Sequence, residues 1–579
     1  MKKLMLGNAA AARGLYEAGC CLISSYPGTP STEITEQAAQ YPEIYCEWAP
    51  NEKVAMEVAF GAALAGKRSA CVMKHVGVNV AADPLFTISY TGVNAGIVIC
   101  VADDAGIHSS QNEQDSRRYA IAAKLPMLEP ADSQEAYRFA QIAYELSEEY
   151  DTPVFLKLCT RISHSQSIVE TGERQEAPAR PYVKDIPKYV MVPGNARPRH
   201  PIVEERTRKL IAFAETTDLN REEMGEDVSL GIITSSTSYQ YAREVFGEKA
   251  SILKLGLVNP LPRQKILDFA AKVDKVIVLE ELDPVIEDHC RALGLEVIGK
   301  DKMPLVGEFA QGMVAEKLQN VEKPWVSLDE SVPGRPPVLC AGCPHRGLFY
   351  TLAKHKVTVL GDIGCYTLAA YEPLYAIETC ECMGASVSSI HGFNKALGQE
   401  SEGKTVAVLG DSTFMHSGMT GLANIAYNQS NSTVIILDNS ITGMTGHQQN
   451  PTTGKNLRGE PAGKIDLETL CRAMGIHRVR VVDPYDLKAT EEAVLEELAA
   501  QEPSVIITRR PCALLKTVQK HPPYAVDAEK CKGCKMCMRI GCPAISWKDK
   551  KAVVDPTQCV GCGVCEQLCN FDAFLHQEG

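Results

Sequence analysis

Short apolar runs alternate with segments of helical periodicity along most of this chain. In the first 180 residues, SACVM (residues 69–73) and AGIVICVAD (residues 95–103) are bounded by helical segments, and similar runs recur at residues 229–234 and 275–281. This alternation predicts an α/β fold. The Ala and Leu spacing of the first twenty residues predicts an amphipathic helix there rather than a secretory leader.

Two groups of prolines divide the chain. The first group is predicted to form a linker, and the second precedes a further α/β segment that runs to about residue 515. The first group comprises Pro187, Pro193, Pro198 and Pro201, and the second comprises Pro333, Pro336 and Pro337.

At about 150 residues per domain, the 579-residue chain has room for roughly four domains.

Composition places the chain among ordinary globular proteins. It is 45% hydrophobic and 23% charged, and no apolar run approaches the roughly 18 residues that span a bilayer. The net charge of −13 argues against nonspecific binding to nucleic acid. The 22 cysteines, many of them in metal-ligand patterns, favour a reducing, cytoplasmic location.

Cysteines are concentrated near the C-terminal end, where two runs have the forms Cys-x2-Cys-x2-Cys-x4-Cys and Cys-x2-Cys-x2-Cys-x3-Cys. Such runs are typical of two-cluster ferredoxins, in which the fourth cysteine of each run ligates the other cluster. The crossed sets for two [4Fe-4S] clusters are Cys531, Cys534, Cys537 and Cys569, and Cys559, Cys562, Cys565 and Cys542. The alternative is structural zinc, because paired cysteines also suit tetrahedral sulfur sites.

Two apolar runs in the last α/β segment end in polar residues that suit a metal-bound diphosphate. TVAVLGDS ends at Asp411 and Ser412, and STVIILDNS ends just after Asn439. Open α/β sheets bind ligands beyond the carboxyl ends of parallel strands, so these residues are expected at one crevice. Asp411, the Asn439 amide oxygen and the backbone carbonyl of Ile441 would hold Mg²⁺, and Gly410 would permit close approach of a diphosphate. A capped turn is the alternative for Asp411.

A glutamate in the first α/β segment completes this pattern. The strand-end residues resemble the thiamine diphosphate motif that begins Gly-Asp-Gly and closes with Asn, with Ser412 in place of the second glycine. Enzymes with that motif keep a glutamate for the aminopyrimidine of the cofactor. Glu52, in the first turn of the predicted helix APNEKVAMEVAFGAALAG, is expected to be catalytic in this way, ahead of Glu57 one turn later. The alternative is that Glu52 only complements the helix dipole.

Taken together, these residues resemble the large (alpha) subunits of indolepyruvate ferredoxin oxidoreductases, within the 2-oxoacid:ferredoxin oxidoreductase family. The resemblance covers nearly the whole length. Besides the cysteine-rich tail, it is carried by YPGTPSTEI (26–34), NEKVAMEVAFGAAL (51–64), DDAGIHSSQNEQDSR (103–117), LCAGCPHRG (339–347) and GDIGCYTL (361–368).

The resemblance implies four domains within the α/β fold. They are a thiamine pyrimidine-binding domain at residues 1–185, a linker and transketolase C-terminal-like domain at 186–330, a thiamine diphosphate and Mg²⁺-binding domain at 331–520, and a two-cluster ferredoxin-like α+β domain at 521–579. It further implies that Thr29 and His75 lie near the substrate, and that Gly364 and His447 lie near the cofactor.

The implied activity is oxidative decarboxylation of arylpyruvates such as indole-3-pyruvate with CoA, giving an acyl-CoA, CO₂ and reduced ferredoxin. The implied partners are a smaller beta subunit and an external ferredoxin, in an (alpha-beta)2 assembly, with no nucleic acid and no membrane. A sister enzyme acting on phenylpyruvate or branched 2-oxoacids is the alternative. A nonredox thiamine decarboxylase would need Glu52 and Asp411 but no cysteine-rich tail. A subunit that only transfers electrons would need the tail alone, which leaves the first 520 residues unexplained.

Four further cysteines match the ligand pattern of a third cluster, which related pyruvate enzymes bind close to thiamine. They are Cys340, Cys343, Cys365 and Cys512. The alternative is that they are packing residues, because cysteine is among the most buried residue types.

Basic residues crowd around the first tail run of this acidic protein. They are Lys530, Lys532, Lys535 and Arg539. Complementary charge speeds encounter between proteins, so the patch is predicted to dock an acidic ferredoxin. Ordinary solvated side chains are the alternative.

Overall fold

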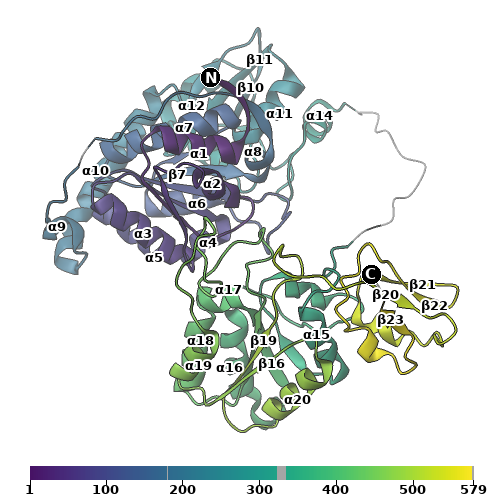
Figure 1. Cartoon of the computed structure of the whole chain (residues 1–579). Coiled ribbons are helices and arrows are strands. Elements are labelled where there is room, and N and C mark those ends of the chain that lie inside the picture. Colours follow the sequence, from purple (N-terminus) through teal and green to yellow (C-terminus); the bar gives the residue numbers. More distant parts are fainter. Residues whose placement is uncertain (179, 322–333, 335, 577–579) are drawn as a thin grey trace. The chain divides into compact units, whose positions relative to one another are not determined.

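The chain forms two compact units, Met1–Leu328 and Asp329–Gly579, called here the N-terminal and C-terminal units (Figure 1). This computed structural model describes residues 1–178, 180–321, 334 and 336–576. Pro333 and the domain boundary predicted at residues 330–331 lie outside the described residues. Among the described helices, none has the length and apolar character needed to cross a membrane.

A seven-stranded sheet forms the core of the N-terminal unit, in the order β12-β6-β7-β5-β4-β2-β3. The strands are β2 (Leu22–Ser25), β3 (Tyr45–Trp48), β4 (Ser69–Lys74), β5 (Ile97–Asp103), β6 (Met127–Leu128), β7 (Val154–Cys159) and β12 (Leu257–Asn259). All pairs are parallel except β12 with β6. Every residue of β4, β5 and β7 is buried, as expected for strands covered by helices on both faces.

The helices of this region follow the strands in βαβ fashion. They are α1 (Gly7–Glu17), α2 (Thr32–Ala38), α3 (Glu52–Leu64), α4 (His75–Val80), α5 (Ala82–Thr91), α6 (Ser116–Ala123), α7 (Ser133–Glu149) and α8 (Thr160–His164). The prediction of one helix over the first twenty residues is wrong at its start. Residues Lys2–Leu6 form β1, which pairs antiparallel with β8 (Gln166–Glu170), and this distant partner overrides the local helical spacing.

A second sheet in the N-terminal unit has the order β14-β13-β10-β11-β9. Its strands are β9 (Arg221–Glu223), β10 (Asp227–Ser235), β11 (Ala250–Leu255), β13 (Val276–Leu279) and β14 (Val297–Ile298), and its helices are α11 (Ser236–Phe246), α12 (Arg263–Ala270), α13 (Val285–Ala292) and α14 (Gln311–Gln319). The strands predicted at residues 229–234 and 275–281 are confirmed as β10 and β13. Strand β12 lies between β11 and α12 in sequence but pairs in the first sheet, so the two segments form one unit.

The linker predicted from the first proline group is wrong, because most of it is helical. After α9 (Ile186–Tyr189), α10 (Pro193–Thr216) contains Pro198 and Pro201 in its interior. Proline removes a helix hydrogen bond at such positions. The helix is held instead by Arg199, which donates to the carbonyl of Tyr90 over 2.7 Å, and by similar contacts from Arg206. Tertiary contacts therefore outweigh the proline signal.

The C-terminal unit is built on a five-stranded parallel sheet in the order β15-β16-β17-β19-β18. The strands are β15 (Thr358–Leu360), β16 (Thr405–Gly410), β17 (Thr433–Asp438), β18 (Arg478–Val482) and β19 (Ser504–Arg509). Ala407 and Leu409 pack on one face of the sheet, and Val406 and Val408 pack on the other. The predicted α/β fold is thus confirmed in both units.

Helices cover both faces of this sheet (Figure 1). They are α15 (His345–Lys354), η1 (Cys365–Ala370), α16 (Ala385–Leu397), η2 (Gly398–Glu400), α17 (Asp411–Thr413), η3 (Phe414–Gly418), α18 (Met419–Tyr427), α19 (Leu467–Ala473) and α20 (Leu487–Leu498).

The cysteine-rich tail is a small α+β module. Its elements are β20 (Tyr524–Val526), η4 (Met536–Ile540), β21 (Ile545–Lys548), β22 (Lys551–Val554), η5 (Glu566–Leu568) and β23 (Phe574–His576). β20 pairs with β23 and β21 pairs with β22, both antiparallel. Leu487 of α20 shares the core of this module, so the tail packs on the C-terminal unit as part of it.

Candidate functional site

Four chemically distinctive residues follow the carboxyl ends of adjacent parallel strands in the C-terminal unit. Cys365 comes shortly after β15, Asp411 directly after β16, Asn439 directly after β17 and Cys512 shortly after β19. Carboxyl ends of parallel strands meet at one edge of a sheet, which is where open α/β folds bind ligands. The crevice predicted from GDS and DNS is therefore formed by neighbouring strands.

Asp411 is a buried acid whose surroundings suit a bound cation. One carboxylate oxygen accepts the backbone N–H of Ser412 over 2.8 Å, and the other accepts the Thr452 hydroxyl over 3.2 Å. Burial and the nearby Asp438 carboxylate raise the pKa of Asp411 to about 7. A divalent cation would stabilise the ionised form, so the donor set fits Mg²⁺.

The other predicted Mg²⁺ ligands lie beside it. Asn439 and Ile441 are buried, and the amide oxygen of Asn439 accepts the N–H of Ile441 over 3.2 Å. The ring of His345, the histidine of the LCAGCPHRG segment, lies 3.4 Å from the Asn439 amide nitrogen. Burial lowers the pKa of His345 to about 4, so the ring is neutral at pH 7. A Cβ on Gly410 would lie 3.2 Å from the Tyr366 ring, which leaves little room for a larger residue.

Gly364 packs against the ring of Tyr366, whereas His447 lies beside Cys512. A Cβ on Gly364 would clash with the ring of Tyr366, so the position requires glycine. The exposed His447 lies against a cysteine rather than against Asp411, with its Nε2 3.8 Å from the Sγ of Cys512. Gly364 and His447 therefore both stay predicted cofactor residues, and His447 also neighbours the candidate third cluster.

The four cysteines of the candidate third cluster gather in the C-terminal unit. Burial, with a contribution from the nearby Cys340 and Cys365 thiols, raises the pKa of the Cys343 thiol to about 12. Burial likewise raises the pKa of Cys365 to about 11, with Cys512 and Cys340 as its thiol neighbours. The four thiols, from three separate loops, are thus electrostatic neighbours of one another, so they stay the predicted ligands of a third cluster.

The first crossed set of tail cysteines surrounds a small cavity. The lining of that cavity includes Cys531, Cys534, Cys537 and Cys569. Burial raises the pKa of Cys537 to about 11, and the other three thiols add to this effect. Cys569 comes from the second run, so the exchange of the fourth ligand between the runs agrees with the predicted pattern.

The second crossed set gathers in the same way. Burial raises the pKa of Cys565, and the thiols of Cys562, Cys542, Cys559 and Cys537 raise it further. Across the described stretches of the chain, no three His, Cys, Asp or Glu side chains lie close enough to hold a single metal ion, and this includes the cysteine groups.

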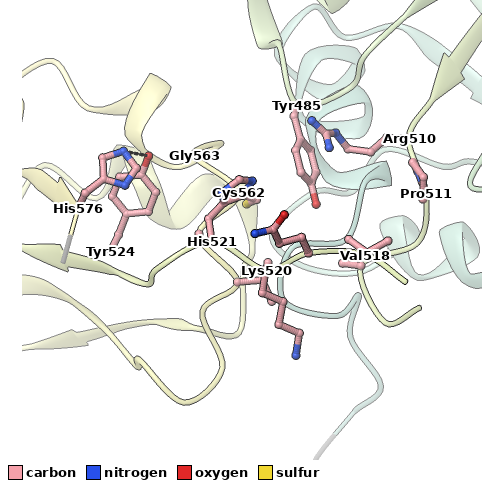
Figure 2. A pocket seen from close by; sticks show the side chains of 14 residues that line it. Tyr485, Arg510, Pro511, Val518, Lys520, His521, Tyr524, Cys562, Gly563 and His576 are labelled. Atoms are coloured by element: carbon pink, nitrogen blue, oxygen red, sulfur yellow. Dashed lines mark hydrogen bonds between the residues drawn. The ribbon is translucent and has the colours of Figure 1, made fainter. Parts of the chain in front are cut away.

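A pocket of about 430 Å³ lies beside the second set (Figure 2). Cys562 lines it, and Figure 2 shows Tyr485 and Arg510 on one side and Tyr524 and His576 on the other. The Arg510 guanidinium stacks over the Tyr485 ring at 4.0 Å. The pocket brings the loop after β19 next to the ferredoxin-like module.

In the N-terminal unit, Glu52 begins α3 and is buried. The Asn51 side chain caps this helix by accepting the N–H of Val54 over 2.9 Å. The Glu52 carboxylate lies against Gly77 of α4, where an added Cβ would be 2.6 Å from its Oε1. Glu57 is exposed and pairs with Lys53. Between the two glutamates, only Glu52 has the buried position that a cofactor contact requires.

Thr29 and His75 follow the neighbouring strands β2 and β4 at the same sheet edge, and Lys74 is the last residue of β4. The Lys74 ammonium donates to the carbonyl of Ser109 over 2.6 Å, and the Ser109 hydroxyl donates to the carbonyl of Thr29 over 3.2 Å. Burial lowers the pKa of Lys74 to about 8. Sequence patterns missed Lys74, although a lysine that ends an apolar strand (SACVMK) is an unusual signal.

His75 is a buried histidine whose ring lies near the backbone of Asn112. It is 1% exposed, and neither ring nitrogen has a well-formed hydrogen bond to a described residue. Burial lowers the pKa of its imidazole, so the ring is neutral at pH 7. Buried polar groups in native proteins are almost always hydrogen-bonded, so we expect the ring nitrogens of His75 to bond a ligand or water.

Two families match separate parts of the chain. Residues 13–227 match the family described as pyruvate flavodoxin/ferredoxin oxidoreductase, thiamine diphosphate-binding. Residues 362–508 match the thiamine pyrophosphate enzyme, C-terminal TPP binding domain. The first match contains Glu52, Lys74 and His75, and the second contains Asp411 and Asn439.

Curated relatives match over almost the full length. Indolepyruvate oxidoreductase subunit IorA of Pyrococcus horikoshii is 40% identical over 99% of this chain and 96% of its own length. The subunit of the same name from Thermococcus kodakarensis is 41% identical with the same coverage. A solved structure of 2-oxoglutarate:ferredoxin oxidoreductase from Magnetococcus marinus superposes with a TM-score of 0.48, at 19% identity, over 55% of this chain and 65% of that chain.

Proposed function

The chain belongs to the indolepyruvate oxidoreductase subunit IorA family, within the 2-oxoacid:ferredoxin oxidoreductases, and we propose that it catalyses thiamine-dependent oxidative decarboxylation of arylpyruvates. Indole-3-pyruvate and CoA would be converted to the acyl-CoA and CO₂, with reduction of a ferredoxin. The convergence of Asp411 and Asn439 at adjacent strand ends, in the same unit as a cavity lined by Cys531, Cys534, Cys537 and Cys569, is the observation that supports this activity best.

Each cofactor has residues that fit it. Thiamine diphosphate supplies the nucleophilic carbon and the electron sink for decarboxylation, and the clusters accept electrons one at a time. Asp411, Asn439 and the carbonyl of Ile441 would hold Mg²⁺, while Gly410 and Ser412 would lie along the diphosphate. Glu52 would hold a proton at a ring nitrogen of the aminopyrimidine.

A third cluster would be held by Cys340, Cys343, Cys365 and Cys512. Its site shares the sheet edge that carries Asp411 and Asn439, so it would be the first acceptor of electrons. The two tail clusters would follow, since the second crossed set lies in the same unit beside the loop after β19.

The substrate carboxylate would be bound near Thr29. Lys74 supplies a buried ammonium that lies near the Asp104 carboxylate, and its described hydrogen bond goes to the backbone carbonyl of Ser109, so it could also contact a substrate anion. The buried ring of His75 follows directly and would contact the same ligand. Burial strengthens such charged contacts, because it excludes competing water.

A beta subunit and an external ferredoxin are the proposed partners, in an (alpha-beta)2 assembly. The name of the relatives, a subunit of an oxidoreductase, supports the first partner. A reducing compartment such as the cytoplasm is the proposed location, because all cysteines within the described residues have free thiols.

An anaerobic assay tests this function. The chain and its beta subunit would be supplied with CoA, thiamine diphosphate, Mg²⁺ and one 2-oxoacid at a time, and ferredoxin reduction would be followed. We expect the highest kcat/KM for indole-3-pyruvate among indole-3-pyruvate, phenylpyruvate and a branched 2-oxoacid. A higher value for phenylpyruvate or for the branched substrate would favour the sister activity, and no 2-oxoacid-dependent reduction would reject the proposal.

A further inference from the structure

Arg346 joins two groups of candidate cluster ligands within the C-terminal unit. It is the second residue of α15, and only 4% of it is exposed. Its Nε donates to the carbonyl of Cys340 over 3.1 Å, and its Nη2 donates to that of Leu339. On its other side, Nη1 donates to the carbonyls of Ile540, over 3.0 Å, and Gly541. One guanidinium therefore ties the CAGC loop to the ferredoxin-like tail.

Among the described residues, no carboxylate accepts a hydrogen bond from Arg346. All of its hydrogen bonds within the described residues go to backbone carbonyls, and its titratable neighbours are the thiols of Cys542, Cys343, Cys340 and Cys562. Arginine stays protonated in proteins, and a buried charge is unfavourable unless an opposite charge lies nearby. Cysteine ligates iron as the thiolate, so loaded clusters would provide that negative charge on both sides.

We propose that Arg346 is a positioning residue for electron transfer, which holds the loop of Cys340 and Cys343 against the tail turn before Cys542 and balances the negative charge of the clusters at both sites. This role rests on the proposed function, because it needs iron-sulfur clusters in the cysteine groups.

The two parts of this role can be separated through Tyr485. Its hydroxyl donates to the carbonyl of Gly342, and its own carbonyl accepts the Gln567 amide over 2.7 Å. Tyr485 therefore also links the CAGC loop to the tail, but it carries no charge. Tyr485→Phe would remove a link and leave the charge in place, whereas Arg346→Gln would remove both.

A matched control exists in the N-terminal unit. Arg206 is 5% exposed, and its guanidinium donates to the carbonyl of Ser89 over 2.9 Å and to that of Asp151 over 3.1 Å. Arg206→Gln removes a guanidinium that is equally buried and also anchored by carbonyls, but it has no cysteine among its titratable neighbours. Any effect of losing a buried arginine as such would appear in this variant too.

The experiment measures cluster potentials in the full-length chain, purified anaerobically. Iron per chain and the potential of each cluster, from a redox titration followed by electron paramagnetic resonance, would be compared for Arg346→Gln, Arg346→Lys, Tyr485→Phe and Arg206→Gln. Reduction adds negative charge, so loss of the Arg346 charge makes it less favourable. In Arg346→Gln we expect at least a tenfold fall in the one-electron equilibrium constant of the cluster held by Cys542, about 59 mV towards lower potential.

The control variants sharpen this result. Arg346→Lys keeps the charge and should retain the potential, whereas Tyr485→Phe and Arg206→Gln should leave all potentials unchanged. Unchanged potentials in Arg346→Gln with full iron content, or an equal shift in Arg346→Lys, would overturn the proposal. If Arg346→Gln does not accumulate with iron, the test depends on Arg346→Lys alone. A tenfold change in the one-electron equilibrium constant of the cluster in Arg346→Lys would overturn the proposal. An unchanged potential in that variant would support it.

Iron content distinguishes a failure of the Arg346 proposal from a failure of the third-cluster proposal. About eight iron atoms per chain, with the Arg346→Gln shift still present in the tail, would reject the third cluster and keep the role of Arg346 at the tail. About twelve iron atoms without any shift would reject the role of Arg346 and keep the third cluster.

Discussion

The backbone N–H of Cys512 donates to the carbonyl oxygen of Asn439 over 2.9 Å. This bond fixes the loop after β19 against the end of β17. On the same edge, a Cβ on Gly443 would lie 3.4 Å from the Sγ of Cys365 and 3.9 Å from the amide nitrogen of Asn439. Cys512, a candidate ligand of the third cluster, therefore contacts the residue that would bind Mg²⁺, and Cys365 lies on the same edge, which would give electrons a short route out of the proposed cofactor site.

The first prediction concerns iron content. Cys512→Ser should lower the iron content from about twelve to about eight atoms per chain while the tail clusters remain, because only one group of four loses a ligand. Cys471→Ser provides the control, since Cys471 is buried in the same unit outside all three groups. Iron analysis of anaerobically purified protein measures both variants. About eight atoms in the unsubstituted chain would contradict the third cluster.

The second prediction concerns Glu52. Glu52→Gln should lower kcat by roughly 10²–10⁴-fold, because a neutral amide cannot exchange a proton with the aminopyrimidine. Glu57→Gln removes a carboxylate from the exposed face of the same helix and should change kcat little. Steady-state ferredoxin reduction at saturating thiamine diphosphate compares the two. A larger loss in Glu57→Gln would reject this assignment.

The third prediction concerns pH and Lys74. Burial lowers the pKa of this ammonium to about 8, so the group is mostly charged at pH 7 and loses its proton as the pH rises through 8. If it binds the substrate carboxylate, kcat/KM should fall above pH 8, since this parameter reports the free enzyme. A pH profile of kcat/KM for indole-3-pyruvate measures the effect.

Substitution identifies the group responsible. Lys74→Met should raise KM by about 10–100-fold, the usual value of a hydrogen bond to a charged group, and should remove the alkaline fall. Lys67→Met, at an exposed lysine that precedes the same strand, should change neither. An alkaline fall that persists in Lys74→Met would assign the titration to another residue.

Sequence patterns located the residues that follow strands, because a parallel sheet brings the ends of its strands together whatever the connections between them. Asp411 and Asn439 could therefore be placed side by side from GDS and DNS alone, and the spacing of the tail cysteines indicated their crossed grouping. The contacts of Arg346 could not be predicted in this way. They join carbonyls that lie up to 195 residues away, and a carbonyl carries no signal in the sequence.

The errors have a similar origin. Pro198 and Pro201 predicted a linker from local conformational preference, but Arg199 and Arg206 anchor that segment as a helix on residues more than 100 positions away. Lys74 was missed because its significance lies in burial beside Thr29. Neither fact follows from residue type or spacing.

The last prediction concerns the basic patch of Lys530, Lys532, Lys535 and Arg539, all of which are exposed. Lys532 and Lys535 line the cavity of the first crossed cysteine set, so the patch lies where electrons would leave the chain. A double charge reversal at Lys530→Glu and Arg539→Glu alters the patch without touching that cavity. At low salt, kcat/KM for an acidic ferredoxin should fall by about tenfold or more, and its dependence on ionic strength should weaken.

Reduction of a small uncharged dye should stay unchanged in this double variant, because the dye needs no docking surface. Lys488→Glu reverses an exposed charge on α20 and should leave ferredoxin reduction as it is. Stopped-flow measurements at several salt concentrations separate association from later steps. If the double variant reduces ferredoxin at the same rate and with the same salt dependence, the lysines and Arg539 are ordinary solvated side chains, and ferredoxin docks elsewhere on the protein.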